Sequence, residues 1–151
     1  MSPLGAHKPV DFFVFVSEQW LLISLLMVLV YAFAMLERSR GGKPLTPAQV
    51  VAELNAERAL LVDVRDAKEF AGGHIHGALH IPHSKMATRM SELEKHRDKT
   101  LILVCKMGQS AAASGKLLTK QGYTVRRLGG GMMEWGNQGM PIVGAKVSSK
   151  S

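Results

Sequence analysis

The single cysteine, Cys105, is the residue whose type and position best suit chemistry. It follows the apolar stretch 101–104 (LILV), which is typical of a buried strand, and precedes an Ala-rich stretch, 110–120, that predicts a helix. Parallel sheets bind ligands at this carboxyl end of their strands. Amides of the loop 106–110 and the positive end of the following helix both stabilise a thiolate or a persulfide anion. From this pattern alone Cys105 is either a catalytic nucleophile or an inert buried thiol.

The loop after Cys105 is predicted to bind the substrate or another anion, and it contains a glycine, a cation and a hydroxyl. Gly108 suits a tight curl because it has no Cβ. Lys106 has two interpretations: it neutralises a bound anion, or its side chain is solvated. Ser110 can hydrogen-bond an anion, whereas Met107 and Gln109 are expected to shape the mouth of the pocket without a catalytic role.

Asp63 and Arg65 lie at the end of the apolar stretch 59–64 (ALLVDV). Side chains two residues apart in a strand share a face, and a buried carboxylate needs a partner. We therefore expect a structural network that supports the loop, with direct catalysis as the alternative. Four nearby histidines match no known zinc spacing, so no metal site is predicted at His74, His76, His80 and His83.

Short apolar runs alternate with helix signals in the second part of the chain. Strands are predicted at 59–64, 78–81, 101–104 and 123–128. Helices are predicted at 47–58, 66–70, 84–94, 110–120 and 132–135. A capping pattern at Thr46 and a glycine at position 122 mark two of the helix ends. This alternation predicts an α/β fold with a central, mostly parallel sheet and helices on both faces.

An uncharged apolar stretch near the start of the chain, WLLISLLMVLVYAFAML, covers residues 20–36. Its seventeen residues rise about 25 Å as a helix, near the lower limit for a hydrocarbon core of about 30 Å. We therefore predict a transmembrane helix over residues 19–37 that contacts the lipid bilayer. The other predicted parts are an N-terminal extramembrane segment (1–18), a linker (38–45), a folded domain (46–144) and a flexible tail (145–151).

The residues that flank the apolar stretch predict its orientation. Arg38, Arg40 and Lys43 follow it, whereas Lys8 is the only Lys or Arg that precedes it. The positive-inside rule then predicts a single-pass protein with its C-terminal domain in the cytoplasm. A cleaved signal peptide ending near Ala34 is the alternative. A membrane-protein partner for the helix is a further hypothesis.

Composition excludes several other classes. A chain of 151 residues has room for one domain and an appendage, and one cysteine permits no internal disulfide. The net charge of +7 suits anionic substrates or anionic lipid headgroups. Nucleic acid is not an expected partner, because no basic run is interleaved with aromatic residues.

Several motifs between residues 45 and 143 resemble those of the rhodanese family of sulfurtransferases. The matching segments are LLVDVR (60–65), EF (69–70), GHIHGA (73–78), IP (81–82), the loop CKMGQS (105–110), GGMMEW (130–135) and PI (141–142). The resemblance implies a rhodanese-like fold over the whole of this region. With the preceding apolar helix, the plan is similar to small bacterial inner-membrane proteins that carry one rhodanese domain, which implies the inner membrane as the location.

The resemblance favours a nucleophilic Cys105 over an inert buried thiol and implies a two-step sulfur transfer that needs no cofactor. Cys105 takes sulfur from a donor such as thiosulfate or a low-molecular-weight persulfide and passes it to a thiol or cyanide. Ala111 stands six positions after Cys105, where related phosphatases have arginine, so phosphate chemistry is not expected. Ser110 stands where thiosulfate-using members often have arginine. This departure leaves a second hypothesis open: a catalytically weak interaction module or persulfide-sensing adaptor at the membrane.

Overall fold

The computed structural model describes residues 14, 17, 19–39 and 41–144. Apart from Val14 and Ser17, the predicted N-terminal segment 1–18 lies outside the described residues, as does the predicted tail 145–151. The chain divides into two compact units, Met1–Glu37 and Arg38–Ser151, and each is described by itself.

The apolar stretch of the first unit forms helix α2, Trp20–Ser39. Its side chains from Trp20 to Leu36 are exposed on every side of the helix. Within the described part of the chain, no helix combines the length and the apolar character that a membrane span requires. The structure therefore does not support the transmembrane helix predicted over residues 19–37.

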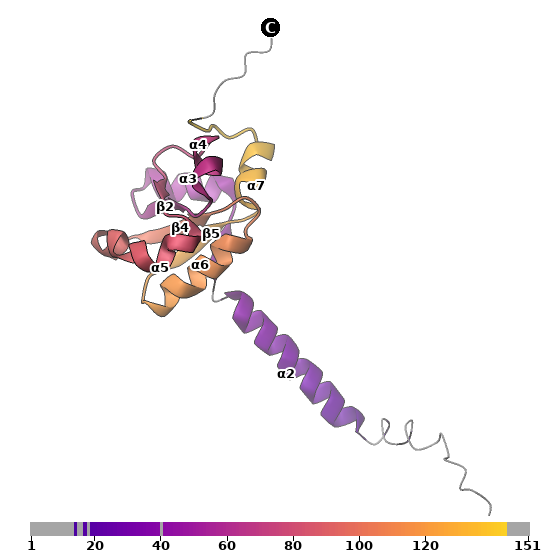
Figure 1. Cartoon of the computed structure of the whole chain (residues 1–151). Coiled ribbons are helices and arrows are strands. Elements are labelled where there is room, and N and C mark those ends of the chain that lie inside the picture. Colours follow the sequence, from indigo (N-terminus) through magenta and orange to yellow (C-terminus); the bar gives the residue numbers. More distant parts are fainter. Residues whose placement is uncertain (1–13, 15–16, 18, 40, 145–151) are drawn as a thin grey trace, which may run out of the picture. The chain divides into compact units, whose positions relative to one another are not determined.

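A five-stranded parallel sheet organises the second unit, and its strand order is β1-β5-β4-β2-β3. Figure 1 labels three of its strands, β2, β4 and β5. Its strands are β1 (Lys43–Leu45), β2 (Ala59–Asp63), β3 (Leu79–His80), β4 (Thr100–Val104) and β5 (Val125–Leu128). The four strands predicted from the sequence are present. The fifth, β1, lies in the segment predicted to be a linker and pairs with β5, which is distant in sequence.

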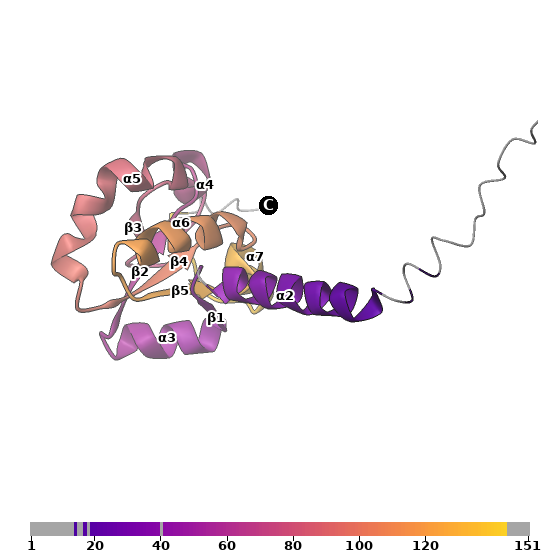
Figure 2. The same cartoon turned by 90° about the horizontal axis from the view of Figure 1, so that it is seen from below.

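Helices cover both faces of the sheet, as predicted (Figure 2). Successive strand residues point to opposite faces, so Leu101 and Leu103 join one core and Ile102 and Val104 the other. The first core packs against α6 (Gln109–Lys120), α5 (Met86–Arg89) and the 3₁₀-helix η2 (Met90–His96). The second packs against α3 (Pro47–Asn55) and α7 (Gly131–Asn137).

Local sequence signals set most of the helix ends. Thr46 and Gln49 form the predicted capping box at the start of α3, and Asp66 caps α4 (Ala67–Ala71). The helical character predicted over 84–94 is present, but it is divided into the 3₁₀-helix η1 (His83–Lys85), then α5 and η2. Met90 and Leu93 both reach the same core, and their spacing of three residues suits the three-residue turn of a 3₁₀-helix.

Candidate active site

Cys105 directly follows β4, and its side chain is 4% exposed. The loop curls back so that the Gly108 backbone N–H donates a hydrogen bond to Cys105 Sγ over 2.8 Å. Gly108 has a φ of +106°, a conformation that residues with a Cβ rarely adopt. A donor held on the sulfur stabilises its anionic form, because a hydrogen bond to a charged group is stronger than one to a neutral group. Gly108 belongs to the loop 106–110, whose backbone amides were predicted to stabilise the anionic sulfur.

The first turn of α7 fixes the loop from its other side. The N–H of Met132 donates to the Cys105 carbonyl over 2.9 Å, and that of Met133 donates to the Lys106 carbonyl over 3.2 Å. Gly131 makes this approach feasible, because a Cβ at that position would overlap the Cys105 carbonyl oxygen. The first N–H groups of α7, which have no partner within the helix, thus fix the backbone of Cys105 and Lys106.

A cavity of about 290 Å³ opens at Cys105. Of the predicted loop, Lys106 and Ser110 line it together with the cysteine. Met107 and Gln109 are exposed and are not among its lining residues. The remaining lining residues come from the ends of β2 and β3 and from α4: Val64, Arg65, Asp66, Glu69, Pro82, His83 and Ser84.

The predicted partners Asp63 and Arg65 form a buried ion pair beside this cavity. Arg65 Nη2 lies 2.6 Å from Asp63 Oδ2, and its side chain also donates to the Gly73 carbonyl over 2.8 Å. The exposed fractions of the two side chains are 8% for Arg65 and 1% for Asp63. The Arg65 backbone N–H donates to Asp63 Oδ1 as well. These contacts fix the chain at the end of β2 and join it to Gly73, so the expected pairing of Asp63 with Arg65 is present.

The charges at the cavity are mixed. Lys106 contributes a cation, whereas Asp66 and Glu69 contribute carboxylates that the sequence analysis did not place at the site. His83 is the second addition: it was grouped with the other histidines, yet it lines the cavity. The sequence contained one signal for this position. Pro82 follows β3 and indicates that the strand has ended, which places His83 in the turn at the carboxyl edge of the sheet.

The neighbouring histidines have structural contacts. His74 stacks on Phe70 with ring centroids 3.8 Å apart, and His80 stacks on the same ring at 4.3 Å. His80 Nε2 also lies 2.9 Å from the Arg65 carbonyl. Across the described ranges, no three His, Cys, Asp or Glu residues are grouped as they would be around a metal ion.

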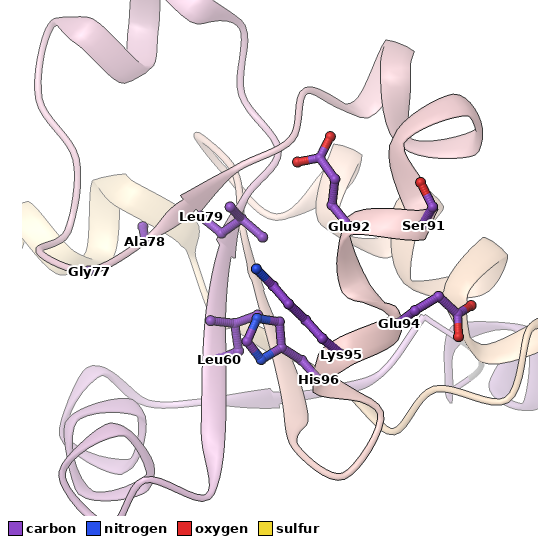
Figure 3. A pocket seen from close by; sticks show the side chains of 9 residues that line it. All are labelled: Leu60, Gly77, Ala78, Leu79, Ser91, Glu92, Glu94, Lys95 and His96. Atoms are coloured by element: carbon purple, nitrogen blue, oxygen red, sulfur yellow. The ribbon is translucent and has the colours of Figure 1, made fainter.

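A larger cavity, about 590 Å³, is lined by residues of β2, β3 and η2 and by neighbouring residues (Figure 3). Leu60 and Leu79 form apolar walls from β2 and β3, and Lys95 and His96 extend toward them from η2. At its rim, hydrogen bonds from Arg89 lower the pKa of Glu92 and hold that carboxylate in its charged form. Cysteine is absent from the lining residues of this cavity, so the cavity at Cys105 is the candidate active site.

Comparison with known proteins matches the fold and covers both units. The family model described as Rhodanese-like domain matches residues 46–138. YibN of Escherichia coli (strain K12) is 33% identical over 132 residues, which is 86% of this chain and 90% of YibN. The match is longer than the second unit, Arg38–Ser151, so it extends into the first unit.

Two further relatives match mainly the second unit. A protein of Allochromatium vinosum named sulfurtransferase is 39% identical over 90 residues, which is 59% of this chain and 82% of that protein. The crystal structure of a rhodanese-related protein from Thermoplasma volcanium superposes with a TM-score of 0.62 at 26% identity, covering 68% of this chain and 98% of that one.

Proposed function

Because the chain belongs to the rhodanese-like domain family, we propose that it is a sulfurtransferase in which Cys105 carries the transferred sulfur. The Cys105 thiolate attacks the sulfane sulfur of thiosulfate or of a low-molecular-weight persulfide. A new bond forms between Sγ and that sulfur, the donor S–S bond breaks, and sulfite or a thiolate leaves with the electron pair. A thiol or cyanide then takes the sulfur and regenerates the thiolate.

The observation that carries this proposal is the hydrogen bond from Gly108 N–H to Cys105 Sγ at the floor of an open cavity. An amide donor fixed by the backbone stabilises negative charge on sulfur before the donor arrives and needs no rearrangement during the reaction. The bonds from α7 to the Cys105 and Lys106 carbonyls hold that geometry in place. Lys106 and Ser110, at the cavity wall, supply a positive charge and a hydroxyl for the departing anion.

Intact-mass spectrometry of the full chain tests the proposal. After incubation with thiosulfate or with glutathione persulfide, we expect a gain of about 32 Da, one sulfur atom, that cyanide or a thiol removes. Cys105→Ser is the matched control: it keeps the size of the side chain and removes the reactive thiol, so no gain is expected. A folded, reduced wild-type protein that gains no sulfur from either donor would contradict the proposal.

We also propose that residues 19–37 hold the protein at the cytoplasmic face of a bacterial inner membrane. Large apolar side chains exposed around α2, from 44% for Ile23 to 68% for Tyr31, are costly in water and favourable against lipid. The basic residues that follow the apolar stretch in the sequence, Arg38, Arg40 and Lys43, suit anionic headgroups. Flotation with anionic vesicles tests this: the full chain floats, and a variant with Leu25, Leu29 and Phe33 changed to Ser does not. Carbonate extraction then separates surface-bound from inserted protein.

A further inference from the structure

His83 is placed at the Cys105 cavity by the backbone. It opens η1 directly after Pro82, where the chain leaves the carboxyl end of β3. The His83 N–H donates to the Val64 carbonyl over 2.9 Å, which fixes this turn against the residue that follows β2. The side chain is exposed and lines the same cavity of about 290 Å³ as Cys105.

A buried hydroxyl on α6 orients the imidazole. His83 Nδ1 lies 2.7 Å from Ser114 Oγ, and Ser114 is fully buried. The bond joins the turn after β3 to the helix that follows the Cys105 loop. Among the described residues, His83 Nε2 has no hydrogen-bond partner, so one ring nitrogen is anchored and the other is available to a molecule in the cavity.

The other ionisable groups at this cavity are less suited to accept a proton at neutral pH. They are Arg65, Asp66, Glu69, Cys105 and Lys106. Arg65 is held by Asp63, carboxylates are weak bases, and an ammonium group has no lone pair to offer. A neutral imidazole offers the lone pair of one ring nitrogen, and histidine is the side chain that enzymes use most often for proton transfer.

We propose that His83 Nε2 accepts the proton of the thiol that takes sulfur from Cys105; this rests on the function proposed above. The acceptor S–H bond breaks and its proton moves to Nε2. The resulting thiolate bonds to the outer sulfur of the Cys105 persulfide, and the Sγ–S bond breaks with its electron pair remaining on Sγ. The sulfur leaves as the acceptor's persulfide anion, and the exposed imidazole returns the proton to solvent.

This assignment makes the role of His83 depend on the acceptor. Glutathione brings a proton that must be removed before its sulfur can attack. Sulfite at pH 8 is largely a dianion and forms thiosulfate with no proton transfer. A residue with only a structural role would affect both acceptors alike.

The test uses full-length protein loaded with persulfide, freed of donor, and mixed with glutathione or sulfite while the loss of sulfur is followed by intact mass. His83→Asn keeps a polar group near the Nδ1 position to meet Ser114 but has none at Nε2. We expect its transfer to glutathione at pH 8 to fall at least about tenfold, with transfer to sulfite within about twofold of wild type. At a pH where glutathione is already a thiolate, the transfer rates of His83→Asn and wild type should become equal. His76→Asn, at an exposed histidine outside the cavity, is the matched control.

Two results would overturn the assignment: an unchanged rate to glutathione in His83→Asn, or an equal loss for both acceptors. His83→Gln, which removes the imidazole but leaves an amide near the Nε2 position, repeats the test if the asparagine variant folds poorly, and the same two results decide it. Failure of wild-type Cys105 to load sulfur would instead overturn the proposed function. Normal loading with an unchanged thiol rate overturns the role of His83 alone.

Discussion

Two arginine–carboxylate pairs at opposite edges of the sheet have similar geometry and different surroundings. At the carboxyl edge, Arg65 and Asp63 approach to 2.6 Å with exposed fractions of 8% and 1%. At the amino edge, before β4, Arg97 and Glu94 approach to 2.7 Å with 47% and 55% exposed. The first pair lies beside the candidate active site and the second faces solvent.

The difference in burial between the two pairs indicates which end of the sheet is held in one conformation. A buried arginine must keep its partner, because the loss of one charge leaves the other unpaired in a medium of low polarity. An exposed pair can exchange its partner for water and ions at little cost. The carboxyl edge therefore holds one arrangement around Cys105, and the amino edge tolerates change.

Replacement of Arg65 should give the largest effect on stability. Arg65→Met leaves the Asp63 carboxylate buried without its partner, and we expect a loss of about 3–5 kcal/mol in the free energy of unfolding. Urea denaturation of the full chain, followed by circular dichroism, measures it. Arg97→Met is the matched control. We expect it to lose only about 1 kcal/mol, because its pair is exposed and its other contacts are one bond to the Gln121 carbonyl and the face of the Tyr123 ring.

A double variant sharpens this test. Asp63→Leu combined with Arg65→Met replaces both charges by apolar groups and should recover much of the lost stability. If Arg65→Met and Arg97→Met lowered the free energy of unfolding by the same small amount, the two edges of the sheet would not differ in their tolerance of substitution.

Gly131→Ala should have the next largest effect, since its Cβ would overlap the Cys105 carbonyl oxygen and its φ is +61°. Overpacking and backbone strain together predict a loss of about 2–4 kcal/mol. Displacement of α7 from the loop carbonyls should also slow sulfur loading of Cys105. Gly136→Ala in the same helix meets no neighbour within 4 Å and should be neutral or slightly stabilising. A Gly131→Ala protein as stable and active as Gly136→Ala would show that α7 does not fix the loop.

The sequence predicted those parts of the molecule that depend on local signals. The strand that ends before Cys105, the glycine loop and the capping box at Thr46 each use residues a few positions apart. Strand β1 was not predicted, because the segment Lys43–Leu45 has only three residues, one of them a proline, and acquires its structure by pairing with residues 126–128. Local hydrophobic periodicity does not reveal a pairing between segments so far apart in the sequence.

The same distinction applies to the site. Cys105, Lys106 and Ser110 were expected together from one loop, and all three line the cavity. The place of His83 depends on Ser114, thirty-one residues away, and that of the loop backbone depends on Gly131. These contacts follow from the tertiary arrangement of β3, α6 and α7. Sequence spacing alone therefore placed Cys105 beside Lys106 and Ser110 and left out the groups that orient their surroundings.

The smallest expected effect concerns Tyr123, which links the amino-edge pair to the core. Burial raises the pKa of the Tyr123 hydroxyl, and the hydrogen bond that it donates to Glu94 over 3.1 Å raises it further, while Arg97 acts in the opposite direction. Because the folded pKa lies above the unfolded value of about 10, this group adds stability below pH 10. That stability is lost as the pH rises through the folded pKa.

Tyr123→Phe should remove this alkaline dependence at the cost of one hydroxyl hydrogen bond, about 1 kcal/mol at neutral pH. Urea midpoints of wild type and variant between pH 8 and 11.5 should therefore converge as the pH rises. The chain has two tyrosines, so the difference between the two ultraviolet titrations isolates the ionisation of Tyr123. If the urea midpoints of wild type and variant instead stayed a constant distance apart at every pH, burial would not raise the pKa of Tyr123. Tyr123 would then belong with the solvated Arg97–Glu94 pair and not with the buried core.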